Sequence, residues 1–219
     1  MKACFDWLMD RRARHLTNRI RAWIPPGSHV ADVGSGTGHN ARAWRELLGA
    51  TVDEFDAADL HWVGDGPMIF DGRKLPVSDQ TYSVVTILFV MHYVHQPAEL
   101  LQEIRRITSG RVVMIQSTYR GTWGRVCLNL RNYVWGPLAY QVARFAGIVR
   151  GQSCPLMTQR LFSRRELRQL FQEAGLTVCH WDTHDWWGLS ISRDLYVLER
   201  NPRTSTCPSS SPRATKNSG

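Results

Sequence analysis

A glycine-rich turn between a short apolar segment and a helical segment constrains the fold of this chain more than any other feature. Residues 29–33 (HVADV) are predicted as a buried strand, residues 34–38 (GSGTG) as a turn and residues 40–48 as a helix. Glycine adopts positive φ and lets a ligand approach the backbone closely. A strand, a glycine turn and a helix in this order are typical of nucleotide sites in doubly wound α/β sheets.

The spacing within the turn limits which ligand it can bind. A dinucleotide fingerprint would place Gly or Ala at position 39, where this chain has His39, and a Walker loop would need Gly-Lys-Ser/Thr, which is absent. The G-x-G-x-G pattern alone is weak, because glycine turns also arise for packing reasons. The flanking sequence is therefore needed to identify the ligand.

Strands and helices are predicted to alternate along the rest of the chain. The 219 residues suit one domain. Further strands are expected at residues 50–55, 68–70, 83–88, 111–116, 176–181 and 194–199, and further helices at 97–107 and 163–174. This alternation predicts a doubly wound α/β fold with a mostly parallel seven-stranded sheet and helices on both faces.

Three segments depart from the alternation. Residues 1–24 are predicted as an N-terminal helix of the mature protein, because Asp6 and Asp10 and the lack of an unbroken apolar core argue against a targeting peptide. The domain would then span residues 25–200 and include an insert at about 117–162. The tail, residues 201–219, is rich in Ser, Thr and Pro and is expected to be disordered.

Cysteine usage bears on the compartment and on metal binding. The five Cys are scattered and form no C-x-x-C pair, which argues against a disulfide framework and favours a reducing, cytoplasmic location. No ligand set with metal-site spacing is present, so we expect no metal. No apolar run is long enough and free enough of charge to predict a membrane-spanning helix.

The segment VADVGSGTGHNARAW resembles motif I of class I S-adenosylmethionine-dependent methyltransferases, in which an acidic residue and one spacer precede G-x-G-x-G. Two later segments, SVVTILFVMHYVHQPAELLQEIRRI and FSRRELRQLFQEAGL, resemble the small type 11 branch of this family. The resemblance covers residues 25–116 and, less closely, 160–200. It implies a Rossmann-like methyltransferase fold with S-adenosyl-L-methionine as the cofactor.

The resemblance also implies the cofactor contacts. Asp56, at the end of the second strand, would bind the ribose hydroxyls, and Asp71 with Gly72 would contact the adenine. Leu88 and Phe89 would line the site near the sulfonium. The methionine end would be held by Asp32, Gly34, Ser35, Gly36 and Gly38.

Methyl transfer from a sulfonium mainly requires alignment of the reactants in a site that excludes water. A general base is needed only where the acceptor is protonated. His92, which follows the fourth strand, is a candidate base, and Tyr119, just past the fifth strand, is a candidate for orienting a hydroxyl or amine. A purely structural role is the alternative for each residue.

The insert combines aromatic residues with arginine. Between Glu103 and Glu166 there are eleven Arg and no acidic residue. The commonest explanation for such an insert is a hydrophobic lid over a small-molecule pocket. A lid that contacts a membrane surface or a lipid acceptor is a second explanation, and a nucleic-acid groove is a third.

The sequence thus predicts methyl transfer to a small or lipophilic acceptor, either in the cytoplasm or at a membrane surface contacted through the insert. The alternatives are an RNA methyltransferase and a catalytically silent cofactor-binding protein that uses the insert as a partner surface. Nucleic acid is disfavoured as a partner, because no RNA-binding module and no N-P-P-Y or Cys-based motif of base methylation is present.

Overall fold

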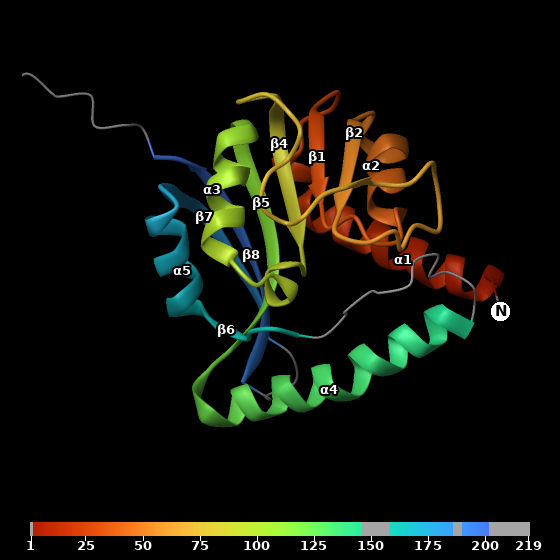
Figure 1. Cartoon of the computed structure of the whole chain (residues 1–219), viewed down its shortest axis with the longest axis vertical. Helices are drawn as coiled ribbons and strands as arrows, with labels where there is room; N and C mark the ends of the chain where they lie inside the picture. Colours follow the sequence, from red (N-terminus) through yellow and green to blue (C-terminus); the bar gives the residue numbers. More distant parts are fainter. Residues whose placement is uncertain (1, 146–157, 186–189, 202–219) are drawn as a thin grey trace, which may run out of the picture.

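The computed structural model describes residues 2–145, 158–185 and 190–201. One mixed sheet runs through these residues, with helices on both faces (Figure 1). Its spatial order is β3-β2-β1-β4-β5-β8-β7, and a short β6 pairs beside the end of β5. The strands are β1 (His29–Val33), β2 (Thr51–Asp56), β3 (Met68–Ile69), β4 (Tyr82–Leu88), β5 (Thr108–Tyr119), β6 (Phe162–Ser163), β7 (Leu176–Asp185) and β8 (Ile191–Arg200).

The strand directions confirm the predicted doubly wound fold. Strands β1 to β6 pair in parallel, whereas β8 is antiparallel to both β5 and β7. The sheet has eight strands rather than the predicted seven, because the two-residue β6 adds a short parallel pair to β5. A strand this short carries no periodicity from which it could be predicted.

Helices cover the two faces of the sheet in pairs. On one face, α1 and α2 enclose a core that includes Ile20, Trp44 and Val113. On the other face, α3 and α5 enclose a core that includes Ile104 and Phe171. The helices are α1 (Lys2–Ile20), α2 (His39–Leu48), α3 (Pro97–Ile107), α4 (Gly121–Phe145) and α5 (Arg164–Glu173), with 3-10 turns η1 (Arg21–Trp23) and η2 (Met91–Tyr93).

Strand β5 extends three residues beyond the predicted 111–116 at each end. At its C-terminal end the extra length is supported by β8, which pairs with β5 from Arg111 opposite Glu199 to Tyr119 opposite Ile191, and at its N-terminal end Thr108 pairs with Tyr82 of β4. The predicted insert therefore begins with the last residues of this strand. Long-range pairing of this kind leaves no mark in the local sequence pattern.

Most of the described part of the insert forms the 25-residue helix α4, which lies across the carboxyl edge of the parallel strands (Figure 1). It contacts β5 and β8. Residues 146–157 of the insert and residues 202–219 of the tail lie outside the described residues. Within the described ranges, no helix has the length and apolarity needed to cross a membrane.

Candidate cofactor and acceptor site

A cavity of about 550 Å³ opens at the carboxyl edge of the sheet, where β1, β2 and β4 end. Gly34 and Gly36 line it from the turn after β1, and Asp56 lines it from the end of β2. Leu88 and Phe89 line it from the end of β4. Its size is that of a typical small-molecule site, and its position is the usual ligand crevice of doubly wound sheets.

The three glycines of the turn have positive φ, at 80° for Gly34, 57° for Gly36 and 80° for Gly38. A Cβ on Gly34 would collide with the side chain of Val90, and one on Gly38 would lie 2.5 Å from Cε1 of His61. A Cβ on Gly36 would meet no atom within 4 Å. Packing therefore requires glycine at two positions, while at Gly36 the backbone is open to a ligand.

Asp56 holds the glycine turn in place. Its Oδ2 accepts a hydrogen bond from the Gly36 N–H at 2.8 Å, and its Oδ1 accepts from the N–H groups of Ala57 (2.7 Å) and Ala58 (3.3 Å). A carboxylate offers about four acceptor positions, so the backbone already uses most of them. The predicted bonds to two ribose hydroxyls would have to share these oxygens with the backbone.

Asp32 lies behind the turn, fully buried in β1, and is not among the residues that line the cavity. Its Oδ1 accepts a hydrogen bond from Oγ1 of Thr86 at 3.0 Å, and its Oδ2 has no partner among the described residues. Burial, as the main cause, and the nearby carboxylates of Glu54 and Asp56 together raise the pKa of Asp32 to about 8. A neighbouring positive charge would therefore favour its ionised form.

The remaining residues predicted to contact the cofactor differ in position. Asp71 and Gly72 line the cavity, but Oδ1 of Asp71 accepts from the N–H groups of Arg73 (2.9 Å) and Lys74 (3.2 Å), as in an Asx turn. These backbone bonds lower the pKa of Asp71. Ser35, which is buried, and Gly38 are not among the lining residues.

Comparison with known proteins identifies the family. The family described as a methyltransferase domain matches residues 5–180, which is most of the chain. This chain belongs to that methyltransferase family. The protein is an S-adenosylmethionine-dependent methyltransferase, as the resemblance in the sequence predicts, and no curated protein matches it in sequence.

Solved methyltransferases share the fold of this enzyme at low sequence identity. The putative methyltransferase solved in complex with the Haloferax volcanii Trm112 methyltransferase activator is 20% identical, with 88% of this chain and 92% of that chain covered and a TM-score of 0.58. A SAM-dependent methyltransferase from Aquifex aeolicus is 15% identical, with 80% and 84% covered and a TM-score of 0.50. Geranyl diphosphate C-methyltransferase from Streptomyces coelicolor A3(2) is 13% identical, with 81% and 74% covered and a TM-score of 0.53.

His92 of this methyltransferase lies in η2 and is not among the residues that line the cavity. Its Nδ1 faces Nε2 of Gln116 at 3.1 Å, and its ring packs on Tyr93 with centroids 3.9 Å apart. Burial lowers the pKa of His92 to about 4. The imidazole is therefore neutral at neutral pH, and because Nδ1 accepts from the amide, the proton is assigned to Nε2.

Tyr119 lies at the end of β5, next to the start of α5, and is also not among the lining residues. Its hydroxyl donates to Oε2 of Glu166 at 3.3 Å. Glu166 is itself the third residue of a capping box with Ser163, so the contact joins the strand to the capped helix. Burial and the charge of Glu166 raise the pKa of Tyr119.

Two further features lie near the site. Tyr93 lines the cavity, one residue after the predicted His92. Asp6 of α1 contacts His39 of the glycine turn's helix across 33 residues of sequence. Among the described residues, no group of three or more His, Cys, Asp or Glu side chains could hold a metal ion.

Proposed function

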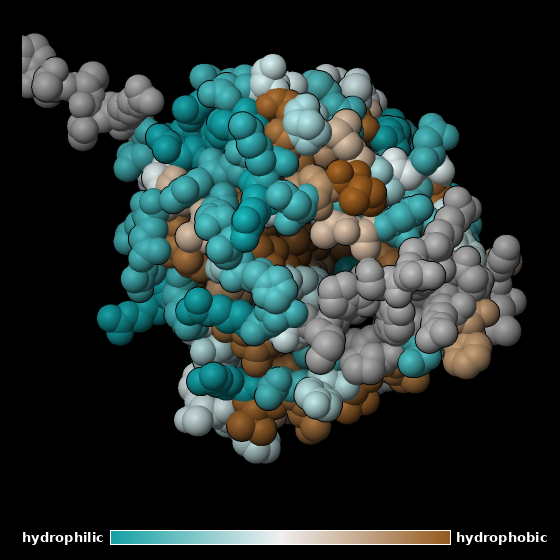
Figure 2. Space-filling view, in the orientation of Figure 1, coloured by the Kyte–Doolittle hydropathy of each residue, from teal (hydrophilic) through white to brown (hydrophobic). Residues whose placement is uncertain are grey.

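We propose that this enzyme methylates a small or lipophilic acceptor that it meets at a membrane surface. The observation that carries the proposal is the outer face of α4. Trp123, Val126, Leu130, Val134 and Leu138 recur at intervals of three or four residues and are all exposed, with Trp123 at 65% and Leu130 at 64%. Figure 2 shows hydrophobic residues gathered along this edge of the molecule.

The opposite side of α4 faces the protein. Leu128 is buried, and Nη2 of Arg131 donates to Oγ of Ser117 at 3.2 Å. The helix therefore has one side packed on the domain and an apolar face without a described partner. It contains arginine and no acidic residue. Aromatic and aliphatic side chains beside arginine suit the interface of an anionic membrane.

For the cofactor, we propose that Gly36 and Asp56 bind the polar groups of S-adenosylmethionine, with Asp71 and Gly72 at the adenine end of the cavity. The open face of Gly36 and the cavity volume fit such a ligand. Asp32, Ser35 and Gly38 would support the turn from behind. When bound, the cofactor supplies an electrophilic methyl group.

On the acceptor side, we propose that Leu88, Phe89 and Tyr93 exclude water where the methyl group is transferred. All three line the cavity at the end of β4. His92 and Tyr119 would act through neighbouring groups. His92 would position Tyr93 and Gln116. Tyr119 would fix the start of α5. Alignment in a dry pocket is the main catalytic requirement of this reaction.

The cofactor is tested by calorimetric titration of the full chain with S-adenosylhomocysteine, with NADH as the comparison ligand. We expect micromolar binding of S-adenosylhomocysteine only. Tritium transfer from labelled S-adenosylmethionine to a lipid extract, an aqueous metabolite extract and total RNA then ranks the acceptor classes. Transfer to RNA alone would overturn the proposed acceptor class.

The membrane contact is tested by sedimentation with vesicles of phosphatidylcholine and phosphatidylglycerol. Replacing two residues of the outer face, Leu130→Ser with Val134→Ser, should weaken vesicle binding by about 10-fold, because each loses apolar area that the membrane would bury. Asn129→Ser on the same helix is the matched control. If the double variant bound vesicles as well as the Asn129→Ser control, or if the unaltered chain bound none, the membrane contact would be overturned. A protein partner for this face would then be favoured.

A further inference from the structure

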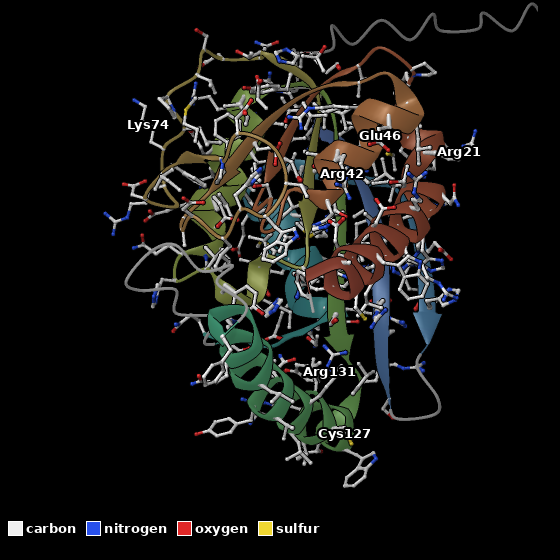
Figure 3. All side chains as sticks on the ribbon, turned by 90° about the vertical axis from the view of Figure 1, so that its right-hand side faces the viewer. Arg21, Arg42, Glu46, Lys74, Cys127 and Arg131 are labelled. Atoms are coloured by element: carbon white, nitrogen blue, oxygen red, sulfur yellow. The ribbon has the colours of Figure 1, made fainter. Side chains whose placement is uncertain are left out.

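Three arginines, Arg12 and Arg19 of α1 and Arg131 of α4, gather around Arg193 of β8. The guanidinium carbon of Arg12 (α1) lies 5.4 Å from the centroid of the Phe89 ring, and that of Arg193 (β8) lies 5.9 Å from it. Arg19, also in α1, donates from Nη2 to the carbonyl oxygen of Arg193 at 2.9 Å. Arg131 extends from α4 toward the end of β5 (Figure 3), where it donates to Ser117, the residue opposite Arg193 in the sheet.

These arginines repel one another. Loss of solvation lowers the pKa of Arg131, and the positive charge of Arg193 lowers it further. Asp182 accepts from Nη2 of Arg19 at 3.3 Å and offsets part of the charge of that arginine. The helix that supplies Arg131 contains no acidic residue, and none occurs anywhere from residue 104 to 165. The field at this place is therefore positive and favours an anion.

We call these four residues the arginine cluster (Arg12, Arg19, Arg131 and Arg193). The cluster lies next to the cavity. Phe89 contributes to both, because it lines the cavity while its ring contacts Arg12 and Arg193. Its φ of 60° is a left-handed conformation that few non-glycine residues adopt. An anion held by the cluster would thus lie about one side chain away from the cavity.

A second polar feature lies near the end of β5. Oε1 of Gln116 is buried without a partner among the described residues, while Nε2 of the same amide contacts His92. Ser117, which follows Gln116 in β5, accepts from Arg131. A buried polar atom without a partner is costly unless a ligand or water satisfies it. The end of β5 therefore offers an unsatisfied polar atom one residue from the contact that Arg131 makes.

We propose that the arginine cluster binds a phosphate or diphosphate group of the acceptor, and so holds the acceptor's nucleophile against the methyl donor. Guanidinium groups match phosphate oxygens with pairs of parallel hydrogen bonds. Several of them gathered in one place suit a group with two or more negative charges better than a single carboxylate. This inference rests on the proposed function and specifies the substrate class for that site.

The test uses inorganic diphosphate as the probe and the full chain saturated with S-adenosylhomocysteine. Calorimetry should show diphosphate binding, and each of Arg131→Gln and Arg12→Gln should weaken it at least 10-fold. Arg12 is an exposed residue of α1, so its variant is expected to fold even if the Arg131 variant does not. Arg125→Gln, an exposed arginine of α4 outside the cluster, is the matched control and should bind as the unaltered chain does.

Absence of diphosphate binding, or equal weakening in the control, would overturn the inference. Because S-adenosylhomocysteine is titrated first in the same samples, failure of the inference is distinguishable from failure of the proposed function. Vesicles of phosphatidylcholine with and without phosphatidic acid separate the two sources of the phosphate. Displacement of the chain from phosphatidic acid vesicles by diphosphate would indicate a lipid headgroup, whereas diphosphate binding without such displacement would indicate a soluble acceptor.

Discussion

Nε2 of His39 lies 2.8 Å from Oδ1 of Asp6, and this contact ties the N-terminal helix to the helix that follows the glycine turn. The other ring nitrogen of His39 lies 2.9 Å from Oγ1 of Thr37, within the turn. Only 3% of His39 is exposed, and burial lowers its pKa. At neutral pH the ring is therefore neutral and bridges α1 to the turn that shapes the cofactor cavity.

The first prediction concerns this bridge. Asp6→Ala removes the bond to His39 and an ion pair with Arg42 at 3.4 Å. We expect the free energy of unfolding to fall by about 1–2 kcal/mol, as for the loss of a partly buried charged hydrogen bond. S-adenosylhomocysteine should also bind several-fold more weakly, because the turn loses an anchor. Urea unfolding and calorimetry measure the two effects.

Glu46→Ala is the control for this variant, because Glu46 joins the same two helices through an exposed ion pair with Arg14 at 3.2 Å. Exposed pairs of this kind contribute little, so the unfolding free energy should change by less than about 0.5 kcal/mol. If Asp6→Ala proved no more harmful than Glu46→Ala, the bridge would have no role in stability or cofactor binding.

The second prediction separates binding from stability in β2. Asp56→Ala should weaken S-adenosylhomocysteine binding by about 10- to 100-fold, since it removes a lining carboxylate and the acceptor for the Gly36 N–H. Asp53→Ala, in the same strand, removes bonds to His29 and Tyr82 at 2.9 Å each, but Asp53 is not a lining residue. The Asp53 variant should lose stability and keep its affinity. Equal affinity in both variants would show that Asp56 does not contact the cofactor.

The sequence predicts the parts of the fold that depend on local pattern. The strand, the glycine turn and the helix from residue 29 to 48 are visible because apolar periodicity and glycine spacing lie within twenty residues. The C-terminal extension of β5 is not, because it depends on pairing with β8, about eighty residues away in the chain. For the same reason the contact between Asp6 and His39 has no local signal.

The residues of the candidate site also differ in whether the sequence could locate them. Asp56 could be located in advance from the resemblance to the methyltransferase family, which implies a carboxylate at the end of the second strand, and it does line the cavity. His92 also follows a strand, yet the turn η2 directs its ring to Gln116 rather than to the cavity. The excess of arginine in the insert is visible in the sequence, but the approach of Arg131 and Arg12 to Arg193 depends on how three elements pack.

The third prediction concerns the pH dependence of stability. The pKa of Asp32 rises from its ordinary 3.8 to about 8 in the folded chain, mainly because it is buried. Between these two values the folded state binds more protons than the unfolded state, so this residue makes stability fall as pH rises from about 4 to about 8. Asp32→Asn, which carries no charge, should remove that slope. Urea unfolding at pH 5, 6, 7 and 8 measures the difference between the two proteins.

The Asn variant should also gain stability relative to the unaltered chain as pH rises, since it avoids an ionised group in a buried site. Thr86→Val is the control, because it removes the hydroxyl that donates to Asp32 without removing the carboxyl group. That variant should keep the slope. Parallel stability curves for the Asn variant and the unaltered chain would show that Asp32 keeps an ordinary pKa.

The fourth prediction concerns the protonation of His92. Its pKa of about 4 lies below the ordinary 6.5, mainly because the ring is buried, so its contribution to stability is complete above pH 6.5 and is lost as pH falls toward 4. His92→Gln should flatten this acid limb of the stability curve.

We also expect unchanged S-adenosylhomocysteine affinity, because His92 is not a lining residue, and a lower rate of methyl transfer, because Tyr93 loses the ring on which it packs. An NMR titration of the imidazole in the unaltered chain, assigned with the variant, measures the pKa directly. A midpoint near 6.5, matched by an inflection of the methyl-transfer rate that the variant lacks, would instead make His92 the general base.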